Sequence, residues 1–521
     1  MIRKPLADWD ATACELLVIG GGATGLGVAL QAALEGRRVV LVEARDFASG
    51  TSSRSTKLLH GGVRYLAQGR LGLVREALHE RARVLQLAPH LAQPLPFVVS
   101  TPRWRTWATM ALGLKLYQWL AGRLSLGPTE LLNAEALARS LPPGLPSGCG
   151  VRYWDGQFDD ARLALALAQS AQQAGARVRN HTEVTALSPL DASEGQGWRV
   201  TLRDAFTGET RTMQARCVVN ATGVWVDALR QLARAGAGQA APQSLVQASQ
   251  GVHLVVDHAT LPLMQAVLMP RTRDGRVLFA VPWLGATVIG TTDTPRADAP
   301  LEPAPLQAEL AFLREETERL LGLRLQPEQV RSVWVGLRPL VGGGENTSAI
   351  SREHAIVREG PGFWTVTGGK WTTYRSMAED VLGRVQRQGD LPAAERAAHT
   401  AEHRLFGAPA ASVPGPSLRD APGPHLLGSQ AAALADVPGH GVALGLGLTE
   451  AMVRHSARQE WAVTVEDMLA RRWRVLFLDS RLAEQMAPRV AQLLQEETGQ
   501  DPQLGAFVAL CQRYRWPTAE H

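Results

Sequence analysis

The segment Leu16–Glu43 reads LLVIGGGATGLGVALQAALEGRRVVLVE, and its pattern predicts the fold. A short apolar run leads into Gly20-x-Gly22-x-x-Gly25, an uncharged helical stretch follows, and a second apolar run ends at Glu43. This is the order of a βαβ unit that binds a dinucleotide. We expect Gly20 to make the tight turn, Gly22 to let the backbone approach a pyrophosphate, and Gly25 to let the helix pack closely on the strand. Glu43 stands where a carboxylate accepts hydrogen bonds from a ribose hydroxyl.

The same segment could be mistaken for a membrane span, because Leu16–Leu34 carries no charged residue. Its five glycines, three of them consecutive, make it a poor membrane helix. Asp8, Asp10 and Glu15 precede it, where a signal peptide would carry positive charge. We interpret it as a buried strand, turn and helix.

Composition describes an ordinary globular protein that is long enough for two or three domains. The 521 residues are 45% hydrophobic and 20% charged. Cys14, Cys149, Cys217 and Cys511 form no closely spaced pair, so no disulfide framework or metal site is expected and a reducing compartment is favoured. The formal net charge is +5, and the sequence shows no motif for nucleic-acid recognition. An anionic substrate or an anionic membrane surface explains it better than nucleic acid does.

The order of elements predicts an α/β protein with an additional α domain. A helix-then-strand pattern resumes at 157–187, and a buried strand at 217–223 ends in a small-residue loop. Residues 249–294 alternate as short strands, which indicates an antiparallel sheet. A proline-rich stretch near 409–424 separates this region from later helical patterns. We expect an oxidoreductase region over 1–400, with cofactor-binding segments at about 14–75, 150–235 and 335–390, a substrate-binding insert at about 76–149 and 236–334, and a helical domain over 401–521.

A loop rich in hydroxyl groups and glycines follows the βαβ unit, and Thr51–Leu66 reads TSSRSTKLLHGGVRYL. Its small residues let the backbone come close to a flat cofactor. Lys57, His60, Arg64 and Tyr65 offer donors for anionic groups. From composition alone, a solvated loop with incidental charges fits equally well.

The run SSRSTKLLHGGVRYL, taken with GGGATGLG, strongly resembles the FAD-dependent glycerol-3-phosphate dehydrogenases of the aerobic, respiratory type. Matches continue along nearly the whole chain in the family's order, at NATGVWVD (220–227), GVHLVV (251–256), VIGTTDT (288–294), GLRPL (336–340), AISREHAI (349–356) and GGKWTTYR (368–375). The resemblance implies a Rossmann-like FAD-binding domain, an inserted antiparallel-sheet substrate domain and a C-terminal helical domain. It also implies one FAD, bound non-covalently by Gly20, Gly22, Gly25, Glu43, Ser52, Ser53, Lys57, His60, Gly61, Thr222, Gly223, Gly369 and Lys370.

The substrate implied by the resemblance is sn-glycerol 3-phosphate, which loses a hydride from C2 to flavin N5 and becomes dihydroxyacetone phosphate. Its dianionic phosphate needs fixed cations, and arginine offers a planar fork of donors. The family motifs assign this role to side chains around the phosphate and the reacting carbon: Arg64, Tyr65, Arg338, Arg352 and Lys370. Arg338 and Arg352 could instead be structural ion pairs.

A base must take the C2 hydroxyl proton, and a histidine has a suitable pKa. We favour His253 in GVHLVV over His60, whose HGG motif belongs to the cofactor loop. Relatives often carry K-G-S-H at this histidine, whereas this chain has Gln250 and Val252 in the lysine and serine positions. We therefore expect a cation and a hydroxyl to be missing from the vicinity of His253, and the effect on substrate contacts stays open.

The resemblance also implies electron transfer to quinone by a cytoplasmic enzyme bound peripherally to the inner face of the cell membrane. Residues 81–129 contain no aspartate or glutamate and fit an interfacial segment. The residues of this segment that we expect at the interface are Trp104, Trp107, Trp119, Arg103, Arg105, Lys115 and Arg123; a core helix is the alternative. An oxidase that uses oxygen, a related FAD-dependent 2-hydroxy-acid or amine oxidoreductase, and a flavin-binding protein without turnover also stay open, and so does a homodimer.

Overall fold

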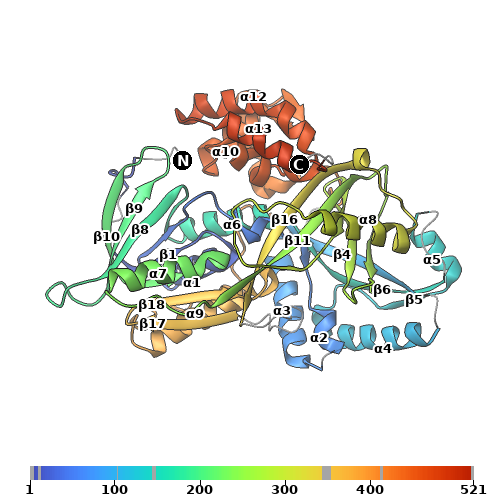
Figure 1. Ribbon diagram of the computed structural model, residues 1–521, viewed down its shortest axis with the longest axis horizontal. Helices are drawn as coiled ribbons and strands as arrows, with labels where there is room; N and C mark the ends of the chain where they lie inside the picture. The colour runs from blue at the N-terminus through green and yellow to red at the C-terminus, as the bar shows by residue number, and fades with distance from the viewer. Residues whose placement is uncertain are drawn as a thin grey trace.

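The computed structural model describes residues 5–9, 13–67, 69–101, 104–142, 148–270, 272–342, 354–410 and 415–517. Two large sheets lie side by side, and a cluster of C-terminal helices lies against both of them (Figure 1). The predicted fold class is therefore confirmed. The domain boundaries given above stay a prediction.

The first sheet is mostly parallel, as the βαβ pattern predicts. Its strand order is β17-β18-β10-β1-β2-β7, in which only β17 at the edge runs antiparallel to its neighbour. A hairpin of two further strands extends it beside β10. The strands are β1 (Ala13–Ile19), β2 (Val39–Val42), β7 (Arg177–Arg179), β8 (Thr182–Pro189), β9 (Trp198–Asp204), β10 (Thr210–Asn220), β17 (His354–Gly360) and β18 (Phe363–Gly368).

Helices cover this sheet because each crossover between parallel strands needs one. Helix α1 (Ala23–Leu34) packs between α6 (Asp160–Gln173) and α9 (Tyr374–Arg387). Helix α7 (Val226–Gly236) contacts β8, which belongs to the hairpin extension. Asp159 caps α6 by accepting a hydrogen bond from the Arg162 amide.

The second sheet is almost entirely antiparallel, with the order β15-β11-β14-β13-β12-β4-β6-β3. Strand β16 pairs with β11 and β5 pairs with β6, while β12 and β4 form a parallel pair. The strands are β3 (Leu58–Leu59), β4 (Ala92–Thr101), β5 (Glu130–Leu132), β6 (Cys149–Phe158), β11 (Val246–Asp257), β12 (Ala266–Met269), β13 (Leu278–Trp283), β14 (Ala286–Gly290), β15 (Thr294–Arg296) and β16 (Val330–Val341).

One face of the second sheet packs against α8 (Gln307–Leu321), where Val252 and Leu254 meet Leu310 and Leu313. Further helices of this half are α2 (Val63–Ala67), α3 (Leu71–Leu87), α4 (Trp104–Ala121) and α5 (Ala134–Ser140). Short 3-10 segments complete the connections: η1 (Thr51–Ser53), η2 (Gly122–Leu124), η3 (Gly223–Trp225), η4 (Pro327–Gln329), η5 (Trp371–Thr373) and η6 (Pro424–Asp436).

The C-terminal part is helical, as predicted. It contains a small hairpin, a π-helical segment and four helices: β19 (Ala443–Gly445), β20 (Leu448–Thr449), α10 (Glu450–Gln459), η7 (Asp467–Arg472), α11 (Val475–Leu478), α12 (Ser480–Thr498) and α13 (Leu504–Arg513). Asp479 caps α12 by accepting hydrogen bonds from the Arg481 and Leu482 amides. These helices share one apolar core with Trp283 and Trp334 of the second sheet. Among the described residues, no helix is both long and apolar enough to cross a bilayer.

Candidate active site

The predicted cofactor residues meet at one edge of the parallel sheet. Gly20, Glu43 and Gly369 directly follow β1, β2 and β18, and Thr222 and Gly223 come just after β10. Carboxyl ends of parallel strands lie at the same edge, which is where open α/β sheets bind ligands.

The glycines at this edge are required by close packing. A Cβ atom on Gly20 would lie 2.6 Å from the Ala221 carbonyl oxygen, and one on Gly25 would overlap the Gly20 carbonyl. Gly22 precedes the first turn of α1, and the Ala23 amide there donates to Ser52 Oγ at 3.0 Å. A helix start with small residues and a nearby hydroxyl fits a pyrophosphate.

Glu43 lies beside this turn with its carboxylate held in place. It accepts hydrogen bonds from the Gly21 amide at 2.7 Å and from the Arg45 amide at 2.9 Å. Burial raises the pKa of Glu43, and these two hydrogen bonds oppose the rise. A carboxylate fixed beside the glycine turn fits the ribose of a dinucleotide.

Residues 51–57, here called the hydroxyl loop, join the two sheets. Thr51 donates to the carbonyl of Leu337 on β16 at 2.6 Å, and the Thr56 hydroxyl lies 3.0 Å from His253 Nε2 on β11. The Ser52 carbonyl accepts from Trp371 Nε1 at 2.8 Å. Ser53 and Lys57 are buried behind the loop rather than facing its open side. Lys57 Nζ lies 2.8 Å from both the Ser53 carbonyl and Asp160 Oδ2.

The HGG motif is fixed from behind by α4. The buried Gly61 amide donates to the Tyr117 hydroxyl at 2.8 Å, and that hydroxyl donates to Asp155 Oδ2 at 2.8 Å. The side chain of Tyr65 lies under Lys370, whose Nζ is 4.0 Å from the ring centroid. Tyr65 and Lys370 are therefore brought together, as a shared site requires. His60 is half-buried next to them along the chain. Arg352 and the side chain of Arg64 lie outside the described residues.

His253 lies on the face of the second sheet that is turned toward the hydroxyl loop. Its ring stacks on Trp334 with centroids 4.0 Å apart and planes 16° apart. Gly290 leaves room for it, because a Cβ atom there would overlap the imidazole. Burial, and then the charges of Lys57 and Arg338, hold the pKa of His253 well below its usual range. The ring is therefore neutral near pH 7.

Arg338 lies on the same face, across Gly251 from His253. In the β11–β16 register Ser249 pairs with Arg338, Gly251 with Gly336 and His253 with Trp334. A side chain on Gly251 would strike the Arg338 guanidinium. That guanidinium is about 3.3 Å from Asp293 Oδ1 and 3.1 Å from Thr291 Oγ1, with 26% of the side chain exposed.

The expectation about Gln250 and Val252 is wrong, because both side chains point to the opposite face of β11. Gln250 donates to Glu309 Oε2 on α8 at 2.6 Å and accepts from Arg296 at 2.7 Å. Val252 is fully buried in the core beneath α8. Alternate residues of a strand face opposite sides of the sheet, so neither replacement reaches the surroundings of His253.

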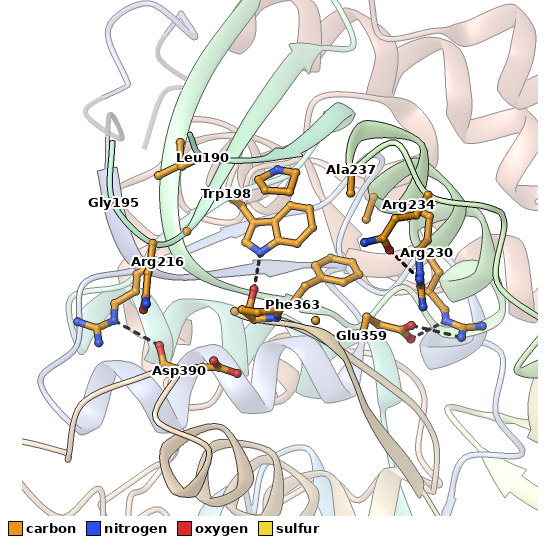
Figure 2. Close-up of a pocket in the computed structure, with 18 residues that line it drawn as sticks. Leu190, Gly195, Trp198, Arg216, Arg230, Arg234, Ala237, Glu359, Phe363 and Asp390 are labelled. Atoms are coloured by element: carbon orange, nitrogen blue, oxygen red, sulfur yellow. Dashed lines mark hydrogen bonds and ion pairs between the residues drawn. The ribbon is translucent and has the colours of Figure 1, made fainter. Parts of the chain in front are cut away.

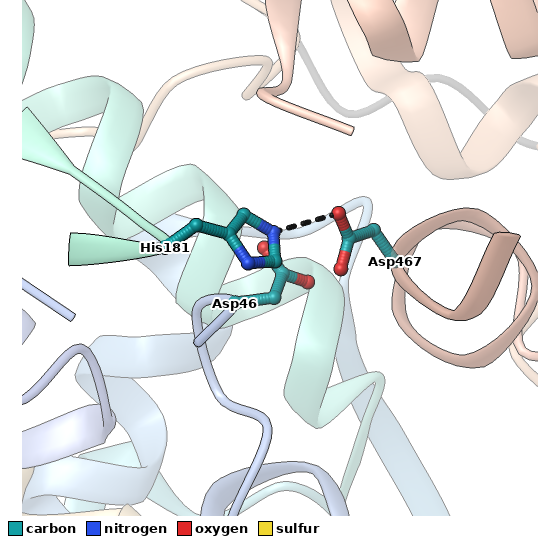
Figure 3. Close-up of side chains that lie close together, drawn as sticks. All are labelled: Asp46, His181 and Asp467. Atoms are coloured by element: carbon teal, nitrogen blue, oxygen red, sulfur yellow. Dashed lines mark hydrogen bonds and ion pairs between the residues drawn. The ribbon is translucent and has the colours of Figure 1, made fainter. Parts of the chain in front are cut away.

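A cluster resembling a metal site lies between the first sheet and the C-terminal domain (Figure 3). Asp46, His181 and Asp467 place ligand atoms near one another, and His181 Nε2 lies 2.9 Å from Asp467 Oδ2. Arg471 and Arg472 already pair with Asp46, and Arg471 also pairs with Asp467 at 2.9 Å. We interpret the cluster as an ion-pair network that joins the domains.

A cavity with a volume of about 350 Å³ lies away from this site. It is lined by Trp198, Arg216, Arg234 and Phe363, among others (Figure 2). Phe363 begins β18 whereas Gly368 ends it, so the cavity lies at the amino edge of the sheet, away from the glycine turn.

Four residues that hold the site together were not predicted as site residues: Tyr117, Asp155, Asp160 and Arg474. No signal local to the sequence assigned them to the site.

Comparison with known proteins agrees with this geometry. A family model described as FAD dependent oxidoreductase matches residues 15–378, and a model of the C-terminal domain of alpha-glycerophosphate oxidase matches 428–504. The fold and site thus define a flavin-dependent oxidoreductase.

Relatives narrow the class. A mitochondrial glycerol-3-phosphate dehydrogenase of Arabidopsis thaliana is 37% identical over 93% of this chain and 82% of its own length. The human mitochondrial enzyme is 36% identical over 94% and 71%. The structure of the Bacillus halodurans glycerol-3-phosphate dehydrogenase complexed with FAD has a TM-score of 0.76 at 28% identity, covering 99% of this chain and 98% of that one. The chain belongs to the FAD-dependent glycerol-3-phosphate dehydrogenase family, and FAD is its cofactor.

Proposed function

We propose that the protein oxidises sn-glycerol 3-phosphate to dihydroxyacetone phosphate and passes the electrons to a membrane quinone. The observation that carries this proposal is the pairing of a neutral, buried His253 with the Arg338 guanidinium on one sheet face, next to a loop that touches the cofactor helix. The relatives' names supply the substrate.

In this proposal the cations hold the phosphate while a histidine takes the hydroxyl proton. Arg338, together with Lys370, Tyr65, Arg64 and Arg352, binds the phosphate and orients C2. A bound FAD would supply the hydride acceptor, flavin N5. His253 accepts the C2 hydroxyl proton in this proposal, and its imidazole is neutral beforehand because burial and two nearby cations lower its pKa.

His60 stays the alternative base. The proposed cofactor contacts are Gly20, Gly22, Gly25, Glu43, Ser52, Ser53, Lys57, His60, Gly61, Thr222, Gly223, Gly369 and Lys370. For Ser53 and Lys57 the proposed role is support of the loop backbone, since both are buried behind it.

The direct test is anaerobic addition of sn-glycerol 3-phosphate to the purified yellow enzyme. Bleaching of the flavin is expected with this compound, and little or none with sn-glycerol 1-phosphate, lactate or glycine. Bleaching by lactate or glycine instead would assign the protein to the related 2-hydroxy-acid or amine oxidoreductases. No bleaching by any of them would favour a flavin-binding protein without turnover.

Helix α4 supports the proposal of a quinone acceptor and of a contact with the membrane. Leu112 and Trp119 are 75% and 74% exposed, Leu116 lies between them, and Lys115 and Arg123 flank the same stripe. An exposed apolar stripe with basic neighbours fits the headgroup region at the inner face of a cell membrane. On the opposite face of α4, the Tyr117 hydroxyl contacts the HGG motif. This helix therefore lies between the cofactor loop and the proposed membrane surface, which supports electron transfer to quinone on this side of the protein.

One member of the predicted interfacial set is wrong. Trp107 is half-buried and donates to the Gly150 carbonyl at 2.9 Å, so it belongs to the core side of α4. The side chains of Arg103, Trp104 and Arg105 lie outside those described.

Vesicle sedimentation tests the membrane contact. The double variant Lys115→Glu/Arg123→Glu should leave anionic vesicles, because each basic residue contributes about 1 kcal/mol near anionic lipid. The exposed pair Arg324→Glu/Arg387→Glu on other helices and loops is a control with the same net charge change. Equal sedimentation of both would refute the role of α4. Reoxidation of the reduced enzyme by a soluble quinone, faster than by oxygen, is expected; the reverse order identifies an oxidase.

A further inference from the structure

The C-terminal domain reaches the hydroxyl loop through a buried arginine that the proposed reaction does not use. Arg474 has no exposed surface and donates from Nη2 to the Ser53 carbonyl at 2.7 Å. The same nitrogen lies 3.2 Å from Asp160 Oδ1, and Nη1 donates to the Ala470 carbonyl at 2.8 Å. The guanidinium lies 4.2 Å from the Phe477 ring centroid. Two domains therefore meet at one side chain.

Arg474 completes a buried set of charges behind the loop. Lys57 and Arg474 face Asp159 and Asp160, and none of the four side chains is exposed. Asp160 also accepts from the Ser55 hydroxyl at 2.7 Å. A buried charge left without its partner is strongly destabilising. The loop is consequently fixed at Ser53, Ser55 and Lys57 by groups that belong to α6 and to the C-terminal domain.

The open side of the same loop carries the contacts that the site needs. Ser52 Oγ accepts a hydrogen bond from the Ala23 amide at the start of α1. The Thr51 hydroxyl donates to the carbonyl of Leu337, the residue before Arg338. The Thr56 hydroxyl forms a hydrogen bond with His253. A displacement of the loop at Ser53 would therefore change its contacts with α1, β11 and β16 at the same time.

The backbone of Arg474 is itself unusual. Its φ of +62° and ψ of +9° are left-handed, a conformation that costs free energy for any residue with a Cβ atom. Glycine would fit this conformation better, yet the position carries the longest cationic side chain. The contacts of that side chain account for its presence.

We propose that Arg474 is a positioning residue for the oxidation reaction: it acts from the C-terminal domain, through Ser53 and Asp160, to set the place of the hydroxyl loop between the cofactor helix and His253. This inference rests on the proposed function of the site. It gives the C-terminal domain a part in the chemistry that is separate from its packing.

Arg472 provides a matched control two residues away. It is equally buried and also bridges the domains, but it pairs with Asp46 and with the Glu460 carbonyl rather than with the loop. Asp46 retains Arg471 and Asn180 as partners when Arg472 is changed. The variants to compare as holoenzymes are Arg474→Met, Arg474→Lys and Arg472→Met, each measured for melting temperature, for the visible circular dichroism of bound flavin, and for kcat and KM with a soluble dye acceptor.

Arg474→Met should lower kcat about tenfold or more, because small misplacements of reacting groups cost large factors in rate, while KM changes by less than about threefold. Its flavin dichroism should change even without substrate. Arg474→Lys keeps the charge but cannot hold both partners, so its kcat should lie between those of Arg474→Met and the unaltered enzyme. Arg472→Met should lower the melting temperature and leave kcat and the dichroism within about twofold.

Two results would overturn the proposal: a flavin-loaded Arg474→Met enzyme with unaltered kcat and dichroism, or an Arg472→Met enzyme that loses as much kcat as Arg474→Met. If Arg474→Met does not fold, Arg474→Lys decides, and unaltered kcat and dichroism in that variant refute the role. Failure of the proposed function is recognised separately, since the unaltered enzyme would then not be bleached by sn-glycerol 3-phosphate, whereas the dichroism still reports on the loop.

Discussion

The carboxyl edge of the parallel sheet and the inner face of the antiparallel sheet meet at one site, but they build it from different materials. At the parallel edge the site consists of backbone amides and of glycines such as Gly20 and Gly25, where neighbouring backbone leaves no room for a side chain. On the antiparallel face they are the side chains of His253 and Arg338, which stand above glycines that leave them room.

The two regions should therefore respond differently to substitutions. Where backbone holds a ligand, one added methyl group can remove binding altogether. Where side chains hold it, a substitution changes rate and affinity but leaves the scaffold in place. The following changes test that separation, from the largest expected effect to the smallest.

Gly25→Ala should abolish flavin binding. The added Cβ atom would overlap the Gly20 carbonyl oxygen, so α1 must move away from β1 and the cradle for the pyrophosphate is lost. We expect a colourless protein by absorbance, with a lower melting temperature. Gly113→Ala on α4 meets open space and should keep its full flavin content. A yellow Gly25→Ala protein would contradict the close packing at this turn.

Arg338→Ala should keep its flavin and lose activity. A hydrogen bond to a charged group contributes about 1.5–3 kcal/mol, which corresponds to a decrease of roughly 10–100-fold in kcat/KM. Both a higher KM and a lower kcat are expected, because phosphate binding also orients C2. Arg338→Lys should recover only part of the loss, since lysine lacks the planar fork. Steady-state kinetics that match the unaltered enzyme would move the phosphate site elsewhere.

Glu43→Gln should weaken FAD binding by roughly tenfold, because a neutral acceptor replaces a charged one at the ribose. Glu43→Arg should weaken it further. Reconstitution of the apoprotein with measured amounts of FAD gives the dissociation constant. An unaltered constant in both variants would show that the ribose lies elsewhere.

Most of the parallel edge could be predicted from sequence, because its signals are local. The glycine turn and the acid after β2 each depend on residues within one turn or one strand end. The antiparallel face was predicted only in part. Period-two alternation was already sufficient to exclude Gln250 and Val252 from the side of His253, but the comparison with K-G-S-H obscured it.

Other parts of the site could not be predicted, because they depend on long-range contacts. Arg474 reaches Ser53 across 421 residues of chain, and no local pattern encodes such a pairing. Lys57 was expected at the cofactor, yet it is fully buried against Asp160 and aromatic rings, and burial lowers its pKa to about 7. Trp107 was misassigned because a helix with two apolar faces gives no sequence signal for which face meets the core.

The pH dependence of flavin reduction tests the choice of base. A base must be neutral to accept the proton, so its rate is lost as the pH falls through its pKa. Since burial, Lys57 and Arg338 lower the pKa of His253, the rate should persist well below pH 6.5. The rate at saturating substrate is the one to measure, because a phosphate monoester itself titrates at about pH 6.

Lys57→Met removes one of the cations that face His253 and should move this acid limb upward, by about one pH unit or less. The other charged group that lowers the pKa of His253, Arg338, stays in place. If the rate of flavin reduction already falls at or above pH 6.5, and Lys57→Met does not change that pH, His60 would be favoured as the base.

Neighbouring residues on opposite faces of β11 give the smallest expected effect and the sharpest contrast. Val252→Ser introduces the serine that relatives carry, but its side chain lies in the core beneath α8. Burying a hydroxyl there should cost about 1–3 kcal/mol of unfolding free energy, visible as a lower melting temperature. The kcat and KM values should stay within about twofold of the unaltered enzyme. Gly251→Ser, one residue away, points a side chain at the Arg338 guanidinium and should lower kcat/KM while affecting the core little. If Val252→Ser changed KM and Gly251→Ser did not, the assignment of the substrate to this face of the sheet would be wrong.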